Sequence, residues 1–218
     1  MFIGHYALGF AAKRIAPRTS LGTLIAAPMF ADLLWPVFLL TGWERVTSVG
    51  GSNPFLNLSF DSYPISHSLL LLIGWGVLFA ALYAMRTRYA RGAAVVGLLV
   101  ISHWALDFVV HVPDLQLYPG SPRFGLELWR SMLGTIFVEG VMFVTGVAIY
   151  LSSTRARDRV GRYAFPGLAL LLVLSYVASL FSPPPSNTRV LATAAIVFGW
   201  LFVGIGAWAD RHREPVAT

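Results

Sequence analysis

The feature that most constrains this chain is a series of six apolar segments, each close to the length of a membrane-spanning helix. About 20 apolar residues are needed to cross the hydrocarbon core of a bilayer as an α-helix. Charged residues make up only 12% of the 218 residues and apolar residues 56%, too apolar a balance for a water-soluble surface. The segments cover residues 21–41, 65–85, 92–110, 131–151, 163–182 and 190–209. We therefore predict an all-α fold, a polytopic membrane helix bundle of six transmembrane helices, forming a single integral membrane domain over residues 1–218.

A seventh apolar stretch, residues 1–12, opens the chain and is too short to span a bilayer. Its basic residues Lys13, Arg14 and Arg18 follow the apolar stretch, whereas a secretory signal peptide carries them first. We predict a short N-terminal helix that is embedded in the membrane or lies at its interface.

The basic residues predict the orientation of the bundle. Twelve of the 16 Lys and Arg residues lie in one alternating set of connections, and only four lie in the other set. Because Lys and Arg near span ends favour the cytoplasm, we predict a multi-pass protein of the cell inner (plasma) membrane with a cytoplasmic C-terminus. Loops 42–64, 111–130 and 183–188 then face outward. The clusters are short and separated by apolar runs, so we expect the lipid bilayer, not a nucleic acid, as the partner of this chain.

Seven ionisable residues lie where a membrane should disfavour them. A charged side chain at the bilayer centre costs roughly 2.5 to 3.5 kcal/mol on insertion scales, so each marks a candidate site. Their depths along the spans, estimated from the helical rise, agree with one level between the midplane and the outer face. In the third span, spacings of four residues place three of them on one stripe. The seven are His5, Asp32, His67, His103, Asp107, His111 and Glu139.

These side chains form a ligand set for a divalent metal. Cysteine is absent, which excludes thiolate zinc sites and cysteine nucleophiles. Several imidazoles with carboxylates suit zinc most simply, with manganese or non-haem iron as alternatives. For Glu139 three roles stay open: a general base, a partner of a ligand, or a neutral carboxyl group. His111 is either part of the centre or a solvated residue at the interface.

Two prolines flank Asp32 at four residues on either side, Pro28 and Pro36. A proline removes the helical hydrogen bond to the carbonyl four residues earlier. Irregular backbone at membrane depth is tolerated where it faces protein or a polar cavity. We predict that the first span is kinked around the site.

Several short motifs resemble the bacterial membrane-bound metal-dependent hydrolases, the YdjM-like family. They are Met-Phe-Ile-Gly-His5-Tyr-Ala, the intramembrane Asp32, Tyr63-Pro-Ile-Ser-His67-Ser, and Ser102-His103-Trp-x2-Asp107-x3-His111-x-Pro-Asp114. The resemblance covers mainly residues 1–120, while residues 125–218 supply three further membrane helices. It implies that His5, Asp32, His67, His103 and Asp107 form the metal centre. The chain departs from the family pattern at Tyr63-Pro-Ile-Ser66, where typical members carry a basic residue and a glycine.

We accordingly expect a membrane-embedded metal-dependent hydrolase whose centre lies in the outer half of the bilayer. Glu139 or His111 would move the proton as the catalytic group, and a site at lipid depth favours a lipid-like or amphiphilic substrate such as an ester. Three alternatives stay open: a transporter or proton relay, a b-type haem protein, and a purely structural membrane protein.

Overall fold

The computed structural model describes residues 1–183, 185 and 187–216. Of the predicted outer loop 183–188, Pro184 and Ser186 lie outside the described residues. The α-helices are α1 (Ile3–Ile15), α2 (Leu21–Ala26), α3 (Phe30–Thr41), α4 (Pro64–His67), α5 (Leu69–Thr87), α6 (Ala90–Val110), α7 (Met132–Ser153), α8 (Arg159–Phe181) and α9 (Thr188–Arg211). Two 3-10 turns, η1 (Pro54–Leu56) and η2 (Leu128–Arg130), lie in the loops.

Five helices of the described chain, α5 to α9, are long and apolar enough to cross a membrane. They coincide with the predicted segments from 65–85 onward, which confirms a helical bundle of membrane-spanning type. The first predicted segment, 21–41, is not one continuous helix but the separate helices α2 and α3. Pro28 lies in the break between them, because it lacks the amide hydrogen that would continue the ladder. The expected kink is thus a full interruption, and the described residues do not confirm the predicted count of six spanning helices.

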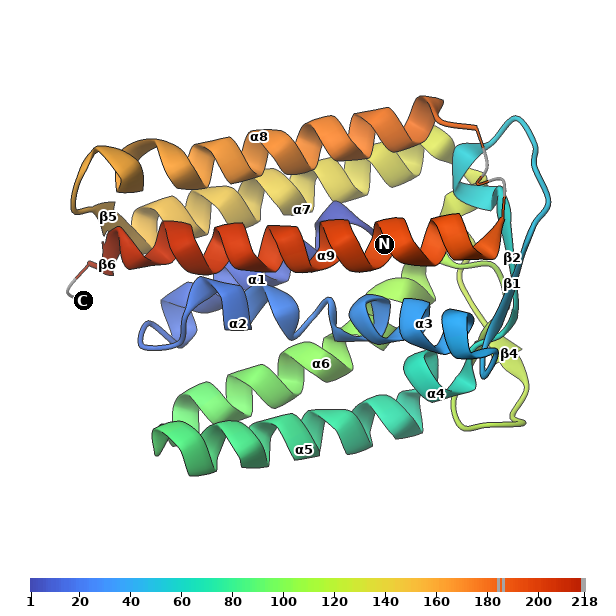
Figure 1. Ribbon diagram of the computed structural model, residues 1–218, viewed down its shortest axis with the longest axis horizontal. Coiled ribbons are helices and arrows are strands. Elements are labelled where there is room, and N and C mark those ends of the chain that lie inside the picture. The colour runs from blue at the N-terminus through green and yellow to red at the C-terminus, as the bar shows by residue number, and fades with distance from the viewer. Residues whose placement is uncertain (184, 186, 217–218) are drawn as a thin grey trace.

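Helix α1 lies inside the bundle (Figure 1). His5, Tyr6 and Phe10 are each at most 1% exposed, and Phe10 packs against Phe143 of α7. The close approach of α1 and α7 requires Gly146, since a Cβ atom there would lie 2.5 Å from the carbonyl oxygen of Ala7. Of the two predicted locations for this helix, the structure favours the embedded one.

The connections gather at two opposite ends of the molecule (Figure 1). One end carries the antiparallel pairs β1 (Arg45–Ser48) with β2 (Leu58–Ser62) and β3 (Leu115–Gln116) with β4 (Arg123–Phe124). The other carries β5 (Thr154–Ala156) paired with β6 (Arg213–Pro215). These strands were not expected from the sequence. The first two pairs each close one loop between helices, and the third joins the α7–α8 connection to the segment after α9.

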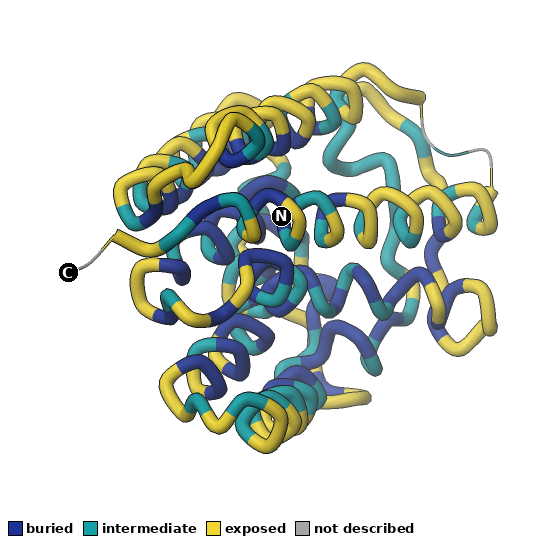
Figure 2. Tube along the Cα trace, turned by 60° about the vertical axis from the view of Figure 1, so that its left-hand side comes forward, coloured by how far each residue is buried: buried dark blue, intermediate teal, exposed yellow. Residues whose placement is uncertain are grey.

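Exposed residues follow the outer sides of the long helices, and buried residues lie toward the middle of the bundle (Figure 2). Many of the exposed side chains are large and apolar, including Leu133, Phe137 and Val144 on α7. Apolar side chains on the outside and polar ones within are what a lipid environment requires.

Candidate metal centre

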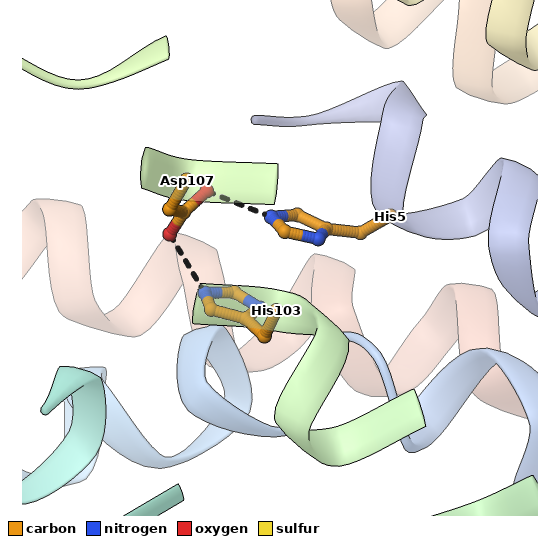
Figure 3. A group of neighbouring side chains, drawn as sticks. All are labelled: His5, His103 and Asp107. Carbon is orange, nitrogen blue, oxygen red and sulfur yellow. Dashed lines mark hydrogen bonds and ion pairs between the residues drawn. The ribbon is translucent and has the colours of Figure 1, made fainter. Parts of the chain in front are cut away.

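His103 and Asp107 lie one turn apart on α6 and are almost completely buried. Their side chains turn toward each other, with His103 Nε2 2.9 Å from Asp107 Oδ2 (Figure 3). The predicted stripe along the third span is therefore present, and it faces the interior of the protein.

Helix α1, which is far from α6 in the sequence, brings His5 to the same pair. His5 Nε2 donates to Asp107 Oδ1 at 3.0 Å, and the rings of His5 and His103 stack with centroids 4.0 Å apart (Figure 3). The α-amino group of Met1 donates to the same Oδ1 at 2.6 Å. Asp107 thus has one oxygen occupied by donors and one, Oδ2, that faces the other histidines.

Two breaks in the helices add Asp32 and His67. Asp32 lies in the first turn of α3, just after the break at Pro28, and His67 ends α4, just before Ser68 separates it from α5. His67 Nε2 is 3.6 Å from Asp32 Oδ1 and 3.9 Å from Asp107 Oδ2. His103 Nε2 is 3.9 Å from Asp32 Oδ1. All five predicted ligands therefore come together.

Hydrogen bonds on the far side of each ring decide which nitrogen carries the proton. His103 Nδ1 lies 2.7 Å from the carbonyl oxygen of Pro28, which can only accept, so Nδ1 is protonated and Nε2 carries the lone pair. That Nε2 is buried and has no hydrogen-bond partner within the described chain, although Asp107 Oδ2 is near. In a neutral ring this directs the Nε2 lone pair at a carboxylate oxygen, and a cation shared by the two atoms, either a proton or a metal ion, offsets their repulsion.

His111 belongs to the same cluster. Its Nδ1 is 2.9 Å from Asp114 Oδ1, and Tyr63 donates its hydroxyl to that same oxygen at 2.5 Å. With Nδ1 donating to the carboxylate, Nε2 carries a lone pair and lies 3.7 Å from Asp107 Oδ2. The side chain is 4% exposed, so of the two interpretations left open the structure favours membership of the centre.

Most separations between these imidazole nitrogens and carboxylate oxygens fit a shared metal ion better than direct hydrogen bonds. Four of them lie between 3.6 and 3.9 Å, beyond hydrogen-bond range. In a tetrahedral zinc site with bonds of about 2.1 Å, neighbouring ligand atoms are about 3.4 Å apart. Imidazole nitrogens and carboxylate oxygens that face one another at such distances could hold a divalent cation. Two groups of side chains offer such atoms together: Asp32, His67 and His103, and His5, His103 and Asp107. In the second group the Nε2 of His5 also meets Oδ1 of Asp107.

Glu139 does not contact the imidazoles in the described structure. Its Oε2 accepts the backbone amides of Phe2 and Gly4, at 2.9 and 3.1 Å. These contacts hold the start of α1, the helix that carries His5. Of the three roles left open for Glu139, the contacts favour a partner that positions a site residue, and its role as a general base stays a prediction.

Sequence reasoning missed Glu44, which lies in the loop between α3 and β1 and is 1% exposed. Its carboxylate meets Ser66, and the hydroxyl of Ser66 is 2.6 Å from His67 Nδ1. In the sequence Glu44 looks like an ordinary solvated loop residue. Only its hydrogen bond to Ser66, next to His67, shows that it belongs to the site.

Comparisons with known protein families, with curated proteins and with solved structures give no match. The resemblance to membrane-bound metal-dependent hydrolases therefore rests on the sequence motifs alone and stays a prediction.

Proposed function

We propose that this protein is an integral membrane metal-dependent hydrolase with a divalent cation, most simply zinc, bound by Asp32, His67, His103 and Asp107. The observation that carries the proposal is the convergence of three imidazole nitrogens on Asp107 Oδ2, which lies 2.9, 3.7 and 3.9 Å from the Nε2 atoms of His103, His111 and His67. A divalent cation at such a centre activates water and polarises a carbonyl or phosphoryl oxygen.

His111 is the residue that we propose to move the proton. Its Nε2 faces the centre, and its Nδ1 is held by Asp114, which fixes the ring orientation. An imidazole with one nitrogen anchored to a carboxylate and the other facing the reacting atoms is the arrangement of a general base. His5 holds Asp107 through a hydrogen bond to Oδ1, and Glu139 holds the start of α1.

Two features support a lipid-like substrate. Asp32 is the one predicted ligand that is substantially exposed, at 34%, so the centre is reached past α3. An apolar groove of about 380 Å³ lies along the α2–α3 break, with Ala27, Phe30 and Leu33 in its wall. Helices α2, α5, α6 and α9 also line it, and this largely apolar wall suits an acyl chain more than a polar substrate.

The alternatives have less support in the geometry. The stacked rings of His5 and His103 are 4.0 Å apart, which leaves no room for a haem between them. A proton relay would need polar groups that continue toward the buried Lys13–Asp210 ion pair, but Tyr6, Phe10 and an apolar cluster lie around that part of α1.

The test is hydrolysis of amphiphilic esters and phosphoesters by detergent-purified protein, before and after removal of metal by a chelator. We expect activity that is lost on chelation, restored by zinc, manganese or iron(II), and absent from the Asp107→Asn variant. A protein that binds no divalent metal, or an activity indifferent to chelation and to this substitution, would contradict the proposal.

A further inference from the structure

Glu44 is a buried carboxylate with no ion pair among the described residues, and its side-chain hydrogen bonds all go to the start of α4, just before His67. Its Oε1 accepts the backbone amides of Ile65 and Ser66, at 2.7 and 2.9 Å, and its Oε2 accepts the hydroxyl of Ser66 at 2.6 Å. The side chain comes from the loop after α3 and is 1% exposed. Burying a charge is costly unless it is fully hydrogen-bonded, and these three donors meet that condition.

The contact between Glu44 and Ser66 determines what Ser66 can do next. A hydroxyl has one proton, and a carboxylate can only accept, so the proton of Ser66 is directed at Glu44. Towards His67 Nδ1, 2.6 Å away, the same oxygen can then only accept. The proton of the neutral imidazole is therefore on Nδ1, and the lone pair is on Nε2, which faces Asp32 and Asp107.

We propose that Glu44 is a positioning residue that acts through Ser66 to hold His67 in the tautomer able to bind the metal. This inference rests on the proposed metal centre for its consequence, although the tautomer exists without the metal. It assigns to the outer loop between α3 and β1 a direct part in building the site. Residues that orient the far nitrogen of a ligating imidazole typically alter metal affinity by about 10- to 100-fold when changed.

The substitution Glu44→Gln tests this role with almost no change in volume. If the amide oxygen keeps the two backbone donors, the NH2 group takes the place of Oε2 and donates to Ser66. The hydroxyl proton of Ser66 then turns to His67 Nδ1, and the imidazole proton moves to Nε2, where it points into the centre. The variant therefore inverts the direction of the whole chain of hydrogen bonds while it keeps the shape.

The tautomer is read from the 15N chemical shifts of the imidazole nitrogens in metal-free, histidine-labelled protein, with the His67 signals identified by their loss in His67→Gln. Zinc affinity is measured separately, by competition with a chelator. For the wild type we expect a protonated Nδ1. For Glu44→Gln we expect a protonated Nε2 and a zinc affinity about 10- to 100-fold lower.

Two further variants keep the test informative if Glu44→Gln misfolds. Ser66→Ala removes the acceptor for Nδ1 and should lower zinc affinity to a similar extent, while Ser66→Thr keeps the hydroxyl and should restore it. Asp210→Asn is the matched control, because Asp210 is also a well-buried, hydrogen-bonded carboxylate but lies at the other end of the bundle, beside Lys13 and Tyr150. It should change neither the tautomer nor the affinity.

The outcomes separate this inference from the proposed function. A wild type with Nδ1 protonated that binds no divalent metal would refute the metal centre and leave the tautomer control intact. A wild type that binds zinc, with Glu44→Gln and Ser66→Ala unchanged in tautomer and affinity, would refute the role of Glu44.

Discussion

The two ring nitrogens of His103 make different contacts, and together these contacts fix the orientation of the ring. One nitrogen donates to the Pro28 carbonyl at the α2–α3 break, and the other faces Asp107 from 2.9 Å. Each of these residues is a proposed direct ligand, so we predict that His103→Ala and Asp107→Asn each lower zinc affinity by more than the 10- to 100-fold, roughly, that is typical when a residue supporting a ligand is changed.

Metal content per protein, measured after dialysis against a defined free-zinc concentration, checks this prediction. The matched control is His212→Ala, since His212 lies beside Asp158 at the opposite end of the bundle and is 30% exposed. Equal zinc content in His103→Ala and His212→Ala would remove α6 from the site.

Between elements, the contact of α1 with α7 positions His5 and depends on Gly146. A Cβ atom there would lie 2.5 Å from the Ala7 carbonyl oxygen and 2.7 Å from the Ala7 Cα, so α1 would have to shift. We predict that Gly146→Ala destabilises the protein by about 1–3 kcal/mol, the range for overpacking, and weakens zinc binding. Thermal unfolding in detergent and chelator competition measure the two effects.

Gly140 on the same helix provides the control. A Cβ atom there would meet nothing within 4 Å, so Gly140→Ala should leave zinc binding unchanged and should not destabilise the helix. If both alanine variants behaved alike, the tight α1–α7 approach would not be needed for the site.

The start of α8 is held by a pH-sensitive cap. Asp158 Oδ1 accepts the backbone amide of Gly161 at 2.8 Å, and Oδ2 lies 2.7 Å from His212 Nδ1. The hydrogen bond from Gly161, followed by that from His212, lowers the pKa of the Asp158 carboxyl below its ordinary value. Its contribution to stability is therefore complete above that ordinary pKa, about 3.9, and is lost as pH falls through the lowered folded-state pKa.

We predict that Asp158→Asn reduces the loss of stability as pH falls below about 4, from the ordinary pKa of an aspartate toward the lowered pKa of Asp158. Thermal unfolding of detergent-solubilised wild type and variant at several pH values measures it. A difference between the two proteins that stays constant across the range would show that this carboxyl is not responsible.

At the scale of the whole molecule, the sequence predicted the features that follow from hydropathy and from the energetic cost of burying charge. Runs of apolar residues predicted α5 to α9, and the cost of intramembrane charge predicted the grouping of His5 with His103 and Asp107 and of Asp32 with His67 and His103. Hydropathy carries no information on backbone hydrogen bonds. The prediction based on it therefore treated α2 and α3 as one span across Pro28.

Other features depend on contacts that no local pattern encodes. Glu44 is an acidic residue in a loop and becomes part of the site only because that loop folds back onto α4. The burial of α1 likewise depends on a glycine, Gly146, that is far away in the chain. In both cases the partner lies on another element, which sequence periodicity does not specify.

The orientation of the whole bundle is predicted by its charges, and the structure makes that prediction sharper. The connections that hold twelve basic residues and those that hold four gather at opposite ends of the molecule (Figure 1). Because Lys and Arg are retained on the cytoplasmic side, reporter fusions after residues 90 and 158 should read cytoplasmic, and fusions near residues 50 and 118 should read external. The candidate metal centre lies toward the end that carries β1 to β4, so the same fusions also decide which side of the membrane this site faces. An external signal at residue 90 together with a cytoplasmic one at residue 50 would invert the bundle and place the centre in the inner half of the bilayer.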